Sequence, residues 1–556
     1  MSRAVHPRMP FATAPTSCFN CGAIITHSLP TPSPTTSAEN LRTTNNPPSD
    51  SDRGAFRKEL KCAQASLVDV SDKIIRLEEN LALLREEKQR LSAAVETYKI
   101  ILNPVRILPD DVLREIFEIC SAPVEDMMAR VISFTNSLDP RKPPWTLGQV
   151  CRRWRSVTAC SSSLWTSIGI VLVESQPSER LNGDIYRLVQ QVQRVGNRPV
   201  CITLKAEESI TKHHPLLLIA SSHSTRWETL YIAMPYETLQ LIDPLIKGNL
   251  PLLKRLRIDV PSMRSDYVGC IDAFQHAPQL RSVGLLRAPT NLKLQISMPW
   301  AQITSYRDLW WKSWRPASTT SPIVQEMSNL THLFASHWIV NNYPRITLLH
   351  LHTLHLDGQH IEQLGENSTF LDGLDIPRLR NLYLSWLPDS HAEMVKRFMQ
   401  RSASTLRAVH IGRRLSSCDV RKILEAIPSS VERFALHDNM DDSDILSALT
   451  LKREVSGHRP QNNIPRCYNL RLYISEGYSW RPPVGPIASS ALLAMVKSRL
   501  PPEVEPEFAL RKFTICGDPR STRWEEARHE LVNGLDIEGL EVDYFPPEGD
   551  SCFPDI

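Results

Sequence analysis

The sequence lacks the marks of secreted and membrane proteins. It opens without the charged-then-apolar pattern of a secretory signal, and no stretch reaches the roughly 18 apolar residues that predict a membrane-spanning helix. Its twelve cysteines are scattered over 556 residues, unlike the dense spacing of a small disulfide-bonded scaffold. We therefore expect free thiols, no membrane partner, and a cytoplasmic or nuclear location.

Signs of catalysis are also missing. The chain has no Gly-rich phosphate loop, nucleophile elbow or paired carboxylate motif. Cys18, Cys21 and His27 supply only part of a zinc site, and no second cysteine pair lies near them. A net charge of +3, with basic residues spread along the chain, leaves no nucleic-acid footprint. The sequence predicts a protein that is not an enzyme, with no catalytic residues, no metal, no cofactor and no nucleic-acid partner.

The first positive signal is a heptad stripe. Apolar residues recur in alternating steps of three and four from Leu67 to Leu102, and only Lys88 interrupts them. The predicted seam is Leu67, Val70, Ile74, Leu77, Leu81, Leu84, Leu91, Val95 and Tyr98. This length favours a coiled-coil helix over residues 56–103, able to form a homodimer, after a Pro- and Ser-rich tail, 1–55, that we expect to be disordered. The alternative is one amphipathic helix packed on the chain's own globular domain.

Two shorter helices and a strand are predicted next. Asn103-Pro104 should end the long helix, since the residue before proline avoids helical backbone angles. A second helix is expected from Pro109, and a third amphipathic stretch runs over 147–157. Leu164-Trp165 then precedes an alternating strand over 168–172.

From about residue 180 a repeat of the form apolar-x-x-apolar-x-apolar appears, with first positions 21 to 28 residues apart over most of its length. Its units are Trp227/Leu230/Ile232, Leu253/Leu256/Ile258, Leu280/Val283/Leu285, Ile303/Tyr306, Leu330/Leu333, Leu351/Leu354/Leu356, Leu379/Leu382/Leu384, Leu406/Val409/Ile411 and Val431/Phe434/Leu436, with later units near Leu470 and at Leu510/Phe513/Ile515. This period, with helical patterns between units, predicts an α/β fold: an irregular leucine-rich-repeat-like solenoid over 171–556. An ordinary α/β domain is the alternative.

Three blocks between residues 104 and 170 resemble an F-box. They are Leu108-Pro109-Asp110-Asp111-Val112-Leu113-Arg114-Glu115-Ile116-Phe117, Leu147-Gly148-Gln149-Val150-Cys151-Arg152-Arg153-Trp154-Arg155 and Ser163-Leu164-Trp165. They match a Leu-Pro helix start, a Val-Cys-Arg-x-Trp helix and a closing Leu-Trp, in that order. The coiled coil before them and the leucine-rich region after them are similar to F-box proteins of mushroom-forming fungi.

The resemblance implies docking on a Skp-type adaptor that is joined to a cullin scaffold. The implied adaptor-binding residues are Leu108, Pro109, Val112, Leu113, Ile116, Phe117, Val150, Cys151, Trp154, Leu164 and Trp165. For Val150, Cys151 and Trp154 the alternative is that they only hold the box together. An insert at about 120–145, with Val124 and Met128 at helical spacing before a Pro-rich end, either loops out or hinders the adaptor.

Together these features predict the substrate-receptor subunit of a cullin-type ubiquitin ligase that promotes protein degradation. The repeat region would hold a target protein, whose identity, and whose need for a modification, the sequence does not reveal. A ligase-independent interaction scaffold is the alternative function.

Overall fold

The protein is described by a computed structural model, which divides into two compact units, Met1–Leu108 and Pro109–Ile556. The described residues are 16–17, 24–25, 36–44, 46–121, 136–211, 213–260, 269–286, 295–309, 323–335, 345–357, 370–385, 392–412, 417–437, 443–451, 453–454, 457–460, 469–474, 489–500, 509–517, 529 and 541–545.

The first unit is dominated by one long helix, α2 (Asp50–Ile101). It begins earlier than predicted because the Ser49 side chain accepts a hydrogen bond from the backbone N–H of Asp52 (3.2 Å) and caps the first turn. It ends where predicted, and Asn103 caps the short 3₁₀ turn η1 (Pro104–Arg106) that follows. Within the expected tail, β1 (Thr16–Ser17) pairs with β2 (Ile24–Ile25) and α1 spans Thr36–Thr43; most of the tail, including Cys18, Cys21 and His27, lies outside the described residues.

The second unit opens with short helices. α3 spans Asp110–Ser121, α4 Leu147–Val150, α5 Arg152–Cys160 and the 3₁₀ helix η2 Ser162–Trp165. The third predicted stretch is therefore two helices, because Cys151 takes an extended backbone conformation and its Sγ accepts a hydrogen bond from the N–H of Trp154 (3.4 Å). The prediction of one continuous amphipathic stretch over 147–157 was wrong at this residue.

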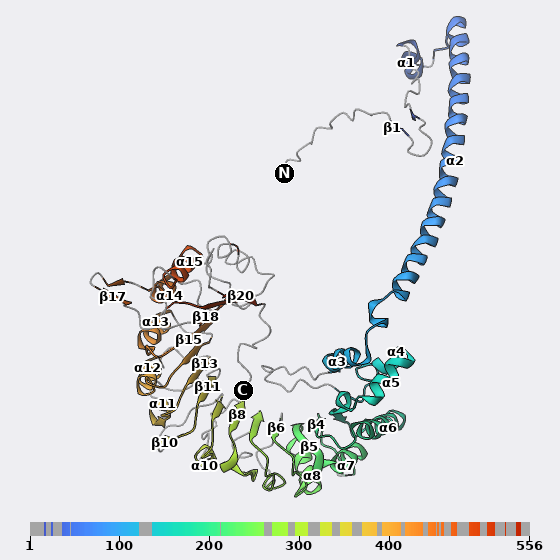
Figure 1. The fold of residues 1–556 in the computed structure, drawn as a ribbon. Coiled ribbons are helices and arrows are strands. Elements are labelled where there is room, and N and C mark those ends of the chain that lie inside the picture. The colour runs from blue at the N-terminus through green and yellow to red at the C-terminus, as the bar shows by residue number, and fades with distance from the viewer. Residues whose placement is uncertain are drawn as a thin grey trace. The chain divides into compact units, whose positions relative to one another are not determined.

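A 14-stranded sheet follows, in which every neighbouring pair is parallel and the strands lie side by side in chain order, as Figure 1 shows. Its strands are β3 (Ser167–Leu172), β4 (Val200–Ala206), β5 (Trp227–Ala233), β6 (Arg255–Asp259), β7 (Ser282–Leu286), β8 (Ser305–Leu309), β9 (His332–Ala335), β11 (Thr353–Asp357), β13 (Asn381–Ser385), β14 (Ala408–Ile411), β15 (Arg433–His437), β18 (Asn469–Ile474), β19 (Lys512–Gly517) and β20 (Glu541–Phe545). Two small sheets, β10 (Ile346–Thr347) with β12 (Leu374–Asp375) and β16 (Arg453–Glu454) with β17 (Gly457–Pro460), stand apart from it.

Helices alternate with these strands and lie along one side of the curved sheet (Figure 1). They are α6 (Ser178–Val195), α7 (Pro215–Ser221), α8 (Tyr236–Ile246), α10 (Ile323–Glu326), α11 (Phe370–Gly373), α12 (Ala392–Arg401), α13 (Ser417–Ala426), α14 (Ser443–Leu449) and α15 (Ser489–Lys497), with the 3₁₀ turns η3 (Ser224–Arg226) and η4 (Trp300–Gln302). The α/β architecture, a long helix followed by a parallel sheet with alternating helices, is consistent with a leucine-rich-repeat-like region.

The register of the sheet explains the sequence repeat. The middle residues of the predicted units pair strand to strand in one row, and each is almost fully buried where burial is described. The row contains Leu230, Leu256, Val283, Tyr306, Leu333, Leu354, Leu382, Val409, Phe434, Leu470 and Phe513. Side chains on successive strands thus stack into a continuous core that no single unit could bury alone.

The structure adds two details to the predicted repeat. β4 adds an earlier unit through Val200, Ile202 and Leu204, whose period-two alternation is visible in the sequence. In β8 the third position of the unit is the buried Asp308 in place of an apolar residue. The first strand of the sheet, β3, begins at Ser167, shortly before the predicted start of the solenoid at residue 171.

Among the described helices, none has the length and apolar character to cross a bilayer.

Candidate docking surface for a partner protein

Helix α3 carries the first of the three sequence blocks, and it has two different apolar sides. Leu113 and Phe117, one turn apart, are buried at 0% and 1% exposure. Val112, Ile116 and Ile119 follow the neighbouring stripe of the helix, and Ile116 and Ile119 are 38% and 77% exposed. We call Val112, Ile116 and Ile119 the α3 ridge.

The buried side of α3 packs on helix α5 and on η2. The rings of Phe117 and Trp154 lie 4.8 Å apart at a tilt of 59°, within the range of favourable aromatic pairs. Leu164 and Trp165 are equally buried, at 4% and 0% exposure, and the Trp165 indole donates a hydrogen bond to the carbonyl of Thr158 (2.9 Å).

This packing divides the predicted adaptor-binding residues into buried and accessible ones. Leu113, Phe117, Leu164 and Trp165 are enclosed by their own chain, so they present no apolar surface to another protein while the fold is kept. Trp154 is half-buried against Phe117, which supports its packing alternative. The sequence did not show which of these residues are buried, because two neighbouring faces of helix α3 are both apolar.

The remaining predicted contact residues are accessible. Pro109 and Cys151 are exposed, Leu108 and Val112 are half-buried, and Val150 is 61% exposed on α4. Ile119 was missed, although its position three residues after Ile116 signalled it. Covering an apolar side chain this exposed is favourable, by a free energy of about 25 cal/mol per Å² of apolar area removed from water.

Polar contacts fix the arrangement of the three blocks. Arg153 of α5 forms an ion pair with Asp110 at the start of α3 (2.7 Å). At the other end of α3, the Ser163 hydroxyl donates to the Glu118 carboxylate (2.5 Å). Both contacts are exposed, so each stabilises the fold only slightly, yet together they connect α3 to both later blocks.

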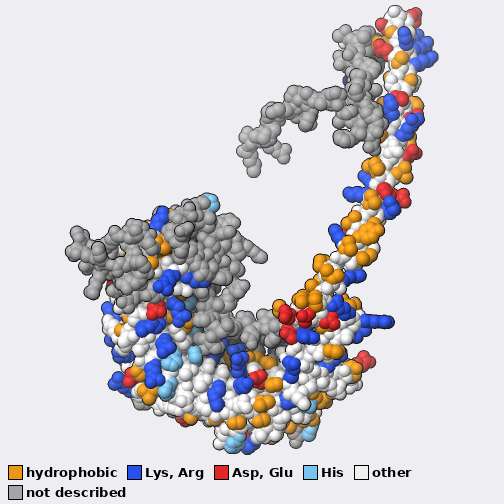
Figure 2. Space-filling view, in the orientation of Figure 1, with side chains coloured by type: hydrophobic (Ala, Val, Ile, Leu, Met, Phe, Trp, Pro, Cys, Tyr) orange, Lys and Arg blue, Asp and Glu red, His pale blue; other side chains and the backbone are white. Residues whose placement is uncertain are grey.

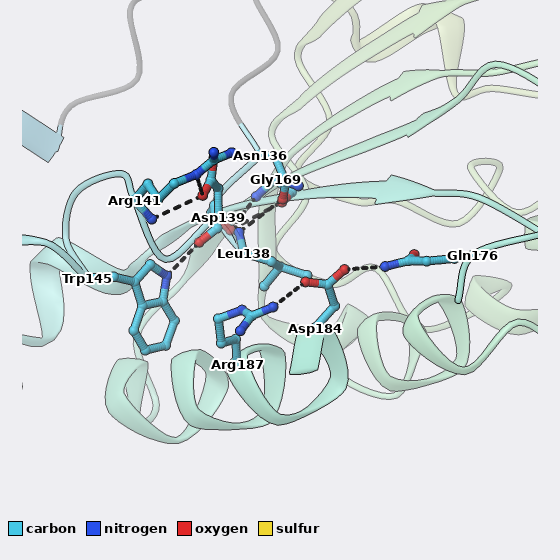
Figure 3. A network of polar contacts seen from close by, with 10 residues as sticks. Asn136, Leu138, Asp139, Arg141, Trp145, Gly169, Gln176, Asp184 and Arg187 are labelled. Atoms are coloured by element: carbon cyan, nitrogen blue, oxygen red, sulfur yellow. Dashed lines mark hydrogen bonds and ion pairs between the residues drawn. The ribbon is translucent and has the colours of Figure 1, made fainter. Parts of the chain in front are cut away.

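The described end of the insert, residues 136–146, covers the first edge of the sheet. The Ser137 N–H donates to the carbonyl of Gly169 in β3 (3.0 Å), and the Gly169 N–H donates to the Ser137 Oγ (3.0 Å). Trp145 donates its indole N–H to the carbonyl of Ser137 (2.7 Å), which closes the turn seen in Figure 3. This end of the insert thus protects an edge strand that would otherwise leave backbone groups unpaired. The predicted helix around Val124 and Met128 lies outside the described residues.

Helix α6 locks this cover in place. Gln191, fully buried, donates to the carbonyl of Ser167 (2.9 Å) and accepts a hydrogen bond from the Ser137 hydroxyl (2.9 Å). On the same helix Asp184 accepts hydrogen bonds from Gln176 and Arg187, each 2.7 Å long, which Figure 3 also shows.

A stacked trio joins the helical blocks to the sheet. Trp145 and Trp165 pack edge to face at 4.7 Å, and the Arg194 guanidinium of α6 lies 4.3 Å from the Trp165 ring centroid. Burial lowers the pKa of Arg194 from its ordinary value, as expected for a cation held against indole rings. The insert, the closing Leu-Trp block and the array therefore share one core.

The long helix offers a second apolar surface. α2 has no buried residue, and its seam residues Leu67, Leu77 and Leu84 are between 63% and 67% exposed. Figure 2 shows orange apolar side chains along this helix between charged ones. Within the first unit the seam of α2 is therefore left uncovered, and packing of this helix on the chain's own globular domain stays the alternative to a coiled coil.

Metal-ligating groups do not converge in the part of the chain that the structure describes. Within that part, the Nδ1 of His352 lies 3.2 Å from the Arg378 carbonyl oxygen, and His350 is exposed.

No protein-family model matches the chain, and no curated protein matches it in sequence.

Proposed function

We propose that the protein is the substrate-receptor subunit of a cullin-type ubiquitin ligase, which docks on a Skp-type adaptor through residues 108–165. The observation that carries this proposal is the α3 ridge. A helix held in place by a buried aromatic core turns a second apolar stripe outward, next to the motif blocks that resemble an F-box.

The docking surface would consist of Leu108, Pro109, Val112, Ile116, Val150 and Cys151, with Ile119 added. The buried Leu113, Phe117, Leu164 and Trp165 would act indirectly, by holding α3 against α5. Interfaces of this kind draw most of their binding energy from a few well-covered apolar side chains, and Ile116 and Ile119 are suited to that role.

The mechanism would be proximity. The receptor forms no covalent intermediate; it holds a target protein on the repeat region and raises the target's concentration near the conjugating enzyme carried by the cullin. The leucine-rich-repeat-like sheet supports this role because its long row of parallel strands offers an extended surface. The exposed heptad seam of α2 would join two receptors as a homodimer.

Adaptor binding tests the proposal. The full chain is co-expressed with a Skp-type adaptor, and recovery of the adaptor is compared for the wild type, Ile116→Glu/Ile119→Glu and Leu108→Ala/Pro109→Ala. Both variants should lose the adaptor at least about tenfold. The first would bury two carboxylates at an apolar interface, which is costly, and the second would remove apolar contact area. Ile75→Glu changes an isoleucine of α2 whose exposure (53%) lies between those of Ile116 and Ile119; it serves as the control and should retain the adaptor.

If the wild type itself retains no adaptor, the ligase proposal fails, and the ligase-independent scaffold becomes the better account. Retention of the adaptor by Ile116→Glu/Ile119→Glu would show that docking uses another surface.

A further inference from the structure

A row of polar and aromatic residues crosses the sheet on the side that faces away from the helices. These positions alternate with the buried core row along each strand and pair across five neighbouring strands. The row contains Tyr231, Arg257, Gly284, Arg307 and Phe334.

Each arginine in this row is held by an aromatic ring. The Arg257 guanidinium carbon lies 5.2 Å from the Tyr231 ring centroid, and that of Arg307 lies 5.1 Å from the Phe334 centroid. Such stacking restrains the planar group and leaves its N–H donors free to point elsewhere. Phe334 is itself backed by His355, whose ring centroid is 3.9 Å away.

Gly284 lies between the two arginines. A Cβ at this position would come within 3.2 Å of the Arg257 Cγ, so a larger residue would press on that side chain. Two strand spacings separate the arginine backbones by about 10 Å, a span that two long side chains can close on one group between them.

Neither arginine is neutralised by an acidic neighbour within the described part of the chain. Asp259, two residues after Arg257 on the same strand, is fully buried. Burial, and secondly the charge of Arg257, lower the pKa of Arg307 to about 10. The protein therefore holds two like charges close together in a half-buried place, an arrangement that a bound anion would stabilise.

We propose that Arg257 and Arg307 form an oxyanion-binding site for a carboxylate or phosphate group on an extended polypeptide. The two guanidinium forks would grip the group from both sides of Gly284 by charge-assisted hydrogen bonds. The site deepens the proposed function, on which its biological meaning rests, because it gives the target held on the sheet a chemical character: an acidic or phosphorylated segment.

Binding of labelled peptides to the full chain, followed by fluorescence anisotropy, tests the site. The probes are a decaglutamate peptide, a Gly-Ser peptide with two phosphoserines, the same peptide unphosphorylated, and a single-stranded oligonucleotide. The wild type should bind one or both anionic peptides and not the neutral one. The stronger of the two identifies whether carboxylate or phosphate is preferred.

Arg257→Gln/Arg307→Gln should weaken that binding at least about tenfold, or ~1.4 kcal/mol. The matched control is Arg255→Gln/Arg433→Gln, which removes the same charge from exposed arginines in the neighbouring row. The affinity of this control for the peptide should stay within about threefold of the wild type. A general effect of lost positive charge would instead weaken peptide binding equally in the two double variants. Arg257→Lys/Arg307→Lys should fall between the two, because lysine keeps the charge without the planar fork.

Unchanged peptide binding by Arg257→Gln/Arg307→Gln, equal losses in the control, or no binding of any peptide by the wild type would overturn the site. Arg257- and Arg307-dependent binding of the oligonucleotide alone would also overturn it as a polypeptide site. Adaptor recovery is measured on the same proteins. If the wild type binds the anionic peptide but does not retain the adaptor, the proposed function is wrong and the oxyanion site remains supported.

Discussion

The long helix α2 and the parallel sheet use the same kinds of residue in opposite ways. Leucines in the sheet rows, such as Leu354 and Leu382, are 0% exposed, whereas Leu67 and Leu84 in the helix are 67% exposed. Each of these sheet leucines pairs with an apolar residue on the next strand of its own chain, whereas the seam of α2 is exposed within the first unit. The array therefore buries its apolar rows with residues of its own chain, while the predicted coiled coil would bury the seam against a second copy.

The largest expected effect is a core truncation in the sheet. Leu382→Ala should lower the free energy of unfolding by about 3 kcal/mol, because it leaves a cavity between Leu354 and Val409. Leu84→Ala on α2 is the matched control and should change the stability of the array by less than about 0.5 kcal/mol. Urea unfolding followed by tryptophan fluorescence measures both; equal losses would contradict the contrast between the two regions.

A change in the heptad seam should act on assembly instead. Leu77→Asp/Leu84→Asp should weaken self-association at least about 100-fold, or ~2.7 kcal/mol, because carboxylates would be buried in the seam. Sedimentation equilibrium of the full chain measures this. Ile75→Asp, which changes an exposed residue beside the seam, should leave association unchanged. A wild type that is monomeric at all concentrations would show that the seam serves another partner.

An intermediate effect is expected where the insert covers the sheet edge. Gln191→Ala should cost about 2 kcal/mol, because it leaves the Ser167 carbonyl and the Ser137 hydroxyl short of buried partners. Gln190→Ala, which loses only a hydrogen bond to Gln193, should cost far less in the same urea titration. Hydrogen exchange at Gly169 should also accelerate in Gln191→Ala, and an unaltered rate there would mean that Gln191 does not secure the cover.

The smallest effect concerns acid stability. Hydrogen bonds from Arg397 lower the pKa of Asp372 below its ordinary value of 3.8, with Arg401 adding to the effect. A carboxylate whose pKa falls on folding stabilises the protein above the unfolded pKa, and this contribution disappears as the pH drops through the folded pKa. Asp372→Asn should therefore destabilise the protein slightly at neutral pH and flatten its loss of stability below about pH 4.

On the long helix, Asp69→Asn breaks the exposed ion pair with Lys73 (2.7 Å) and should leave that pH profile unchanged. Thermal unfolding between pH 3 and pH 7 compares the two variants. Identical profiles would mean that Asp372 gains nothing from its position between α11 and α12.

The sequence was sufficient to predict those elements whose structure follows from a single regular spacing of apolar residues. The spacing of three and four residues from Leu67 gave a continuous helix, Asn103-Pro104 marked its end, and the repeat steps gave strands that pair in register. It was insufficient where side-chain detail decides. Nothing in the spacing showed that Cys151 would cap α5. Nor did it show that Phe117 would point inward and Ile116 outward, because that depends on which elements pack against α3.

The edge of the sheet illustrates the same limit. Ser137 pairs with Gly169 over a separation of 32 residues, and no local pattern announces such a contact. The oxyanion site is likewise invisible in one dimension, because Arg257, Gly284 and Arg307 become neighbours only through the register of the sheet.

Hydrogen exchange of the full chain, with and without a Skp-type adaptor, tests the central claim most directly. The account predicts that the adaptor slows exchange in residues 108–121 and 147–155 and leaves β11 to β15 unchanged. Protection confined to the sheet, or no protection at any position, would contradict the assignment of the α3 ridge as the docking surface.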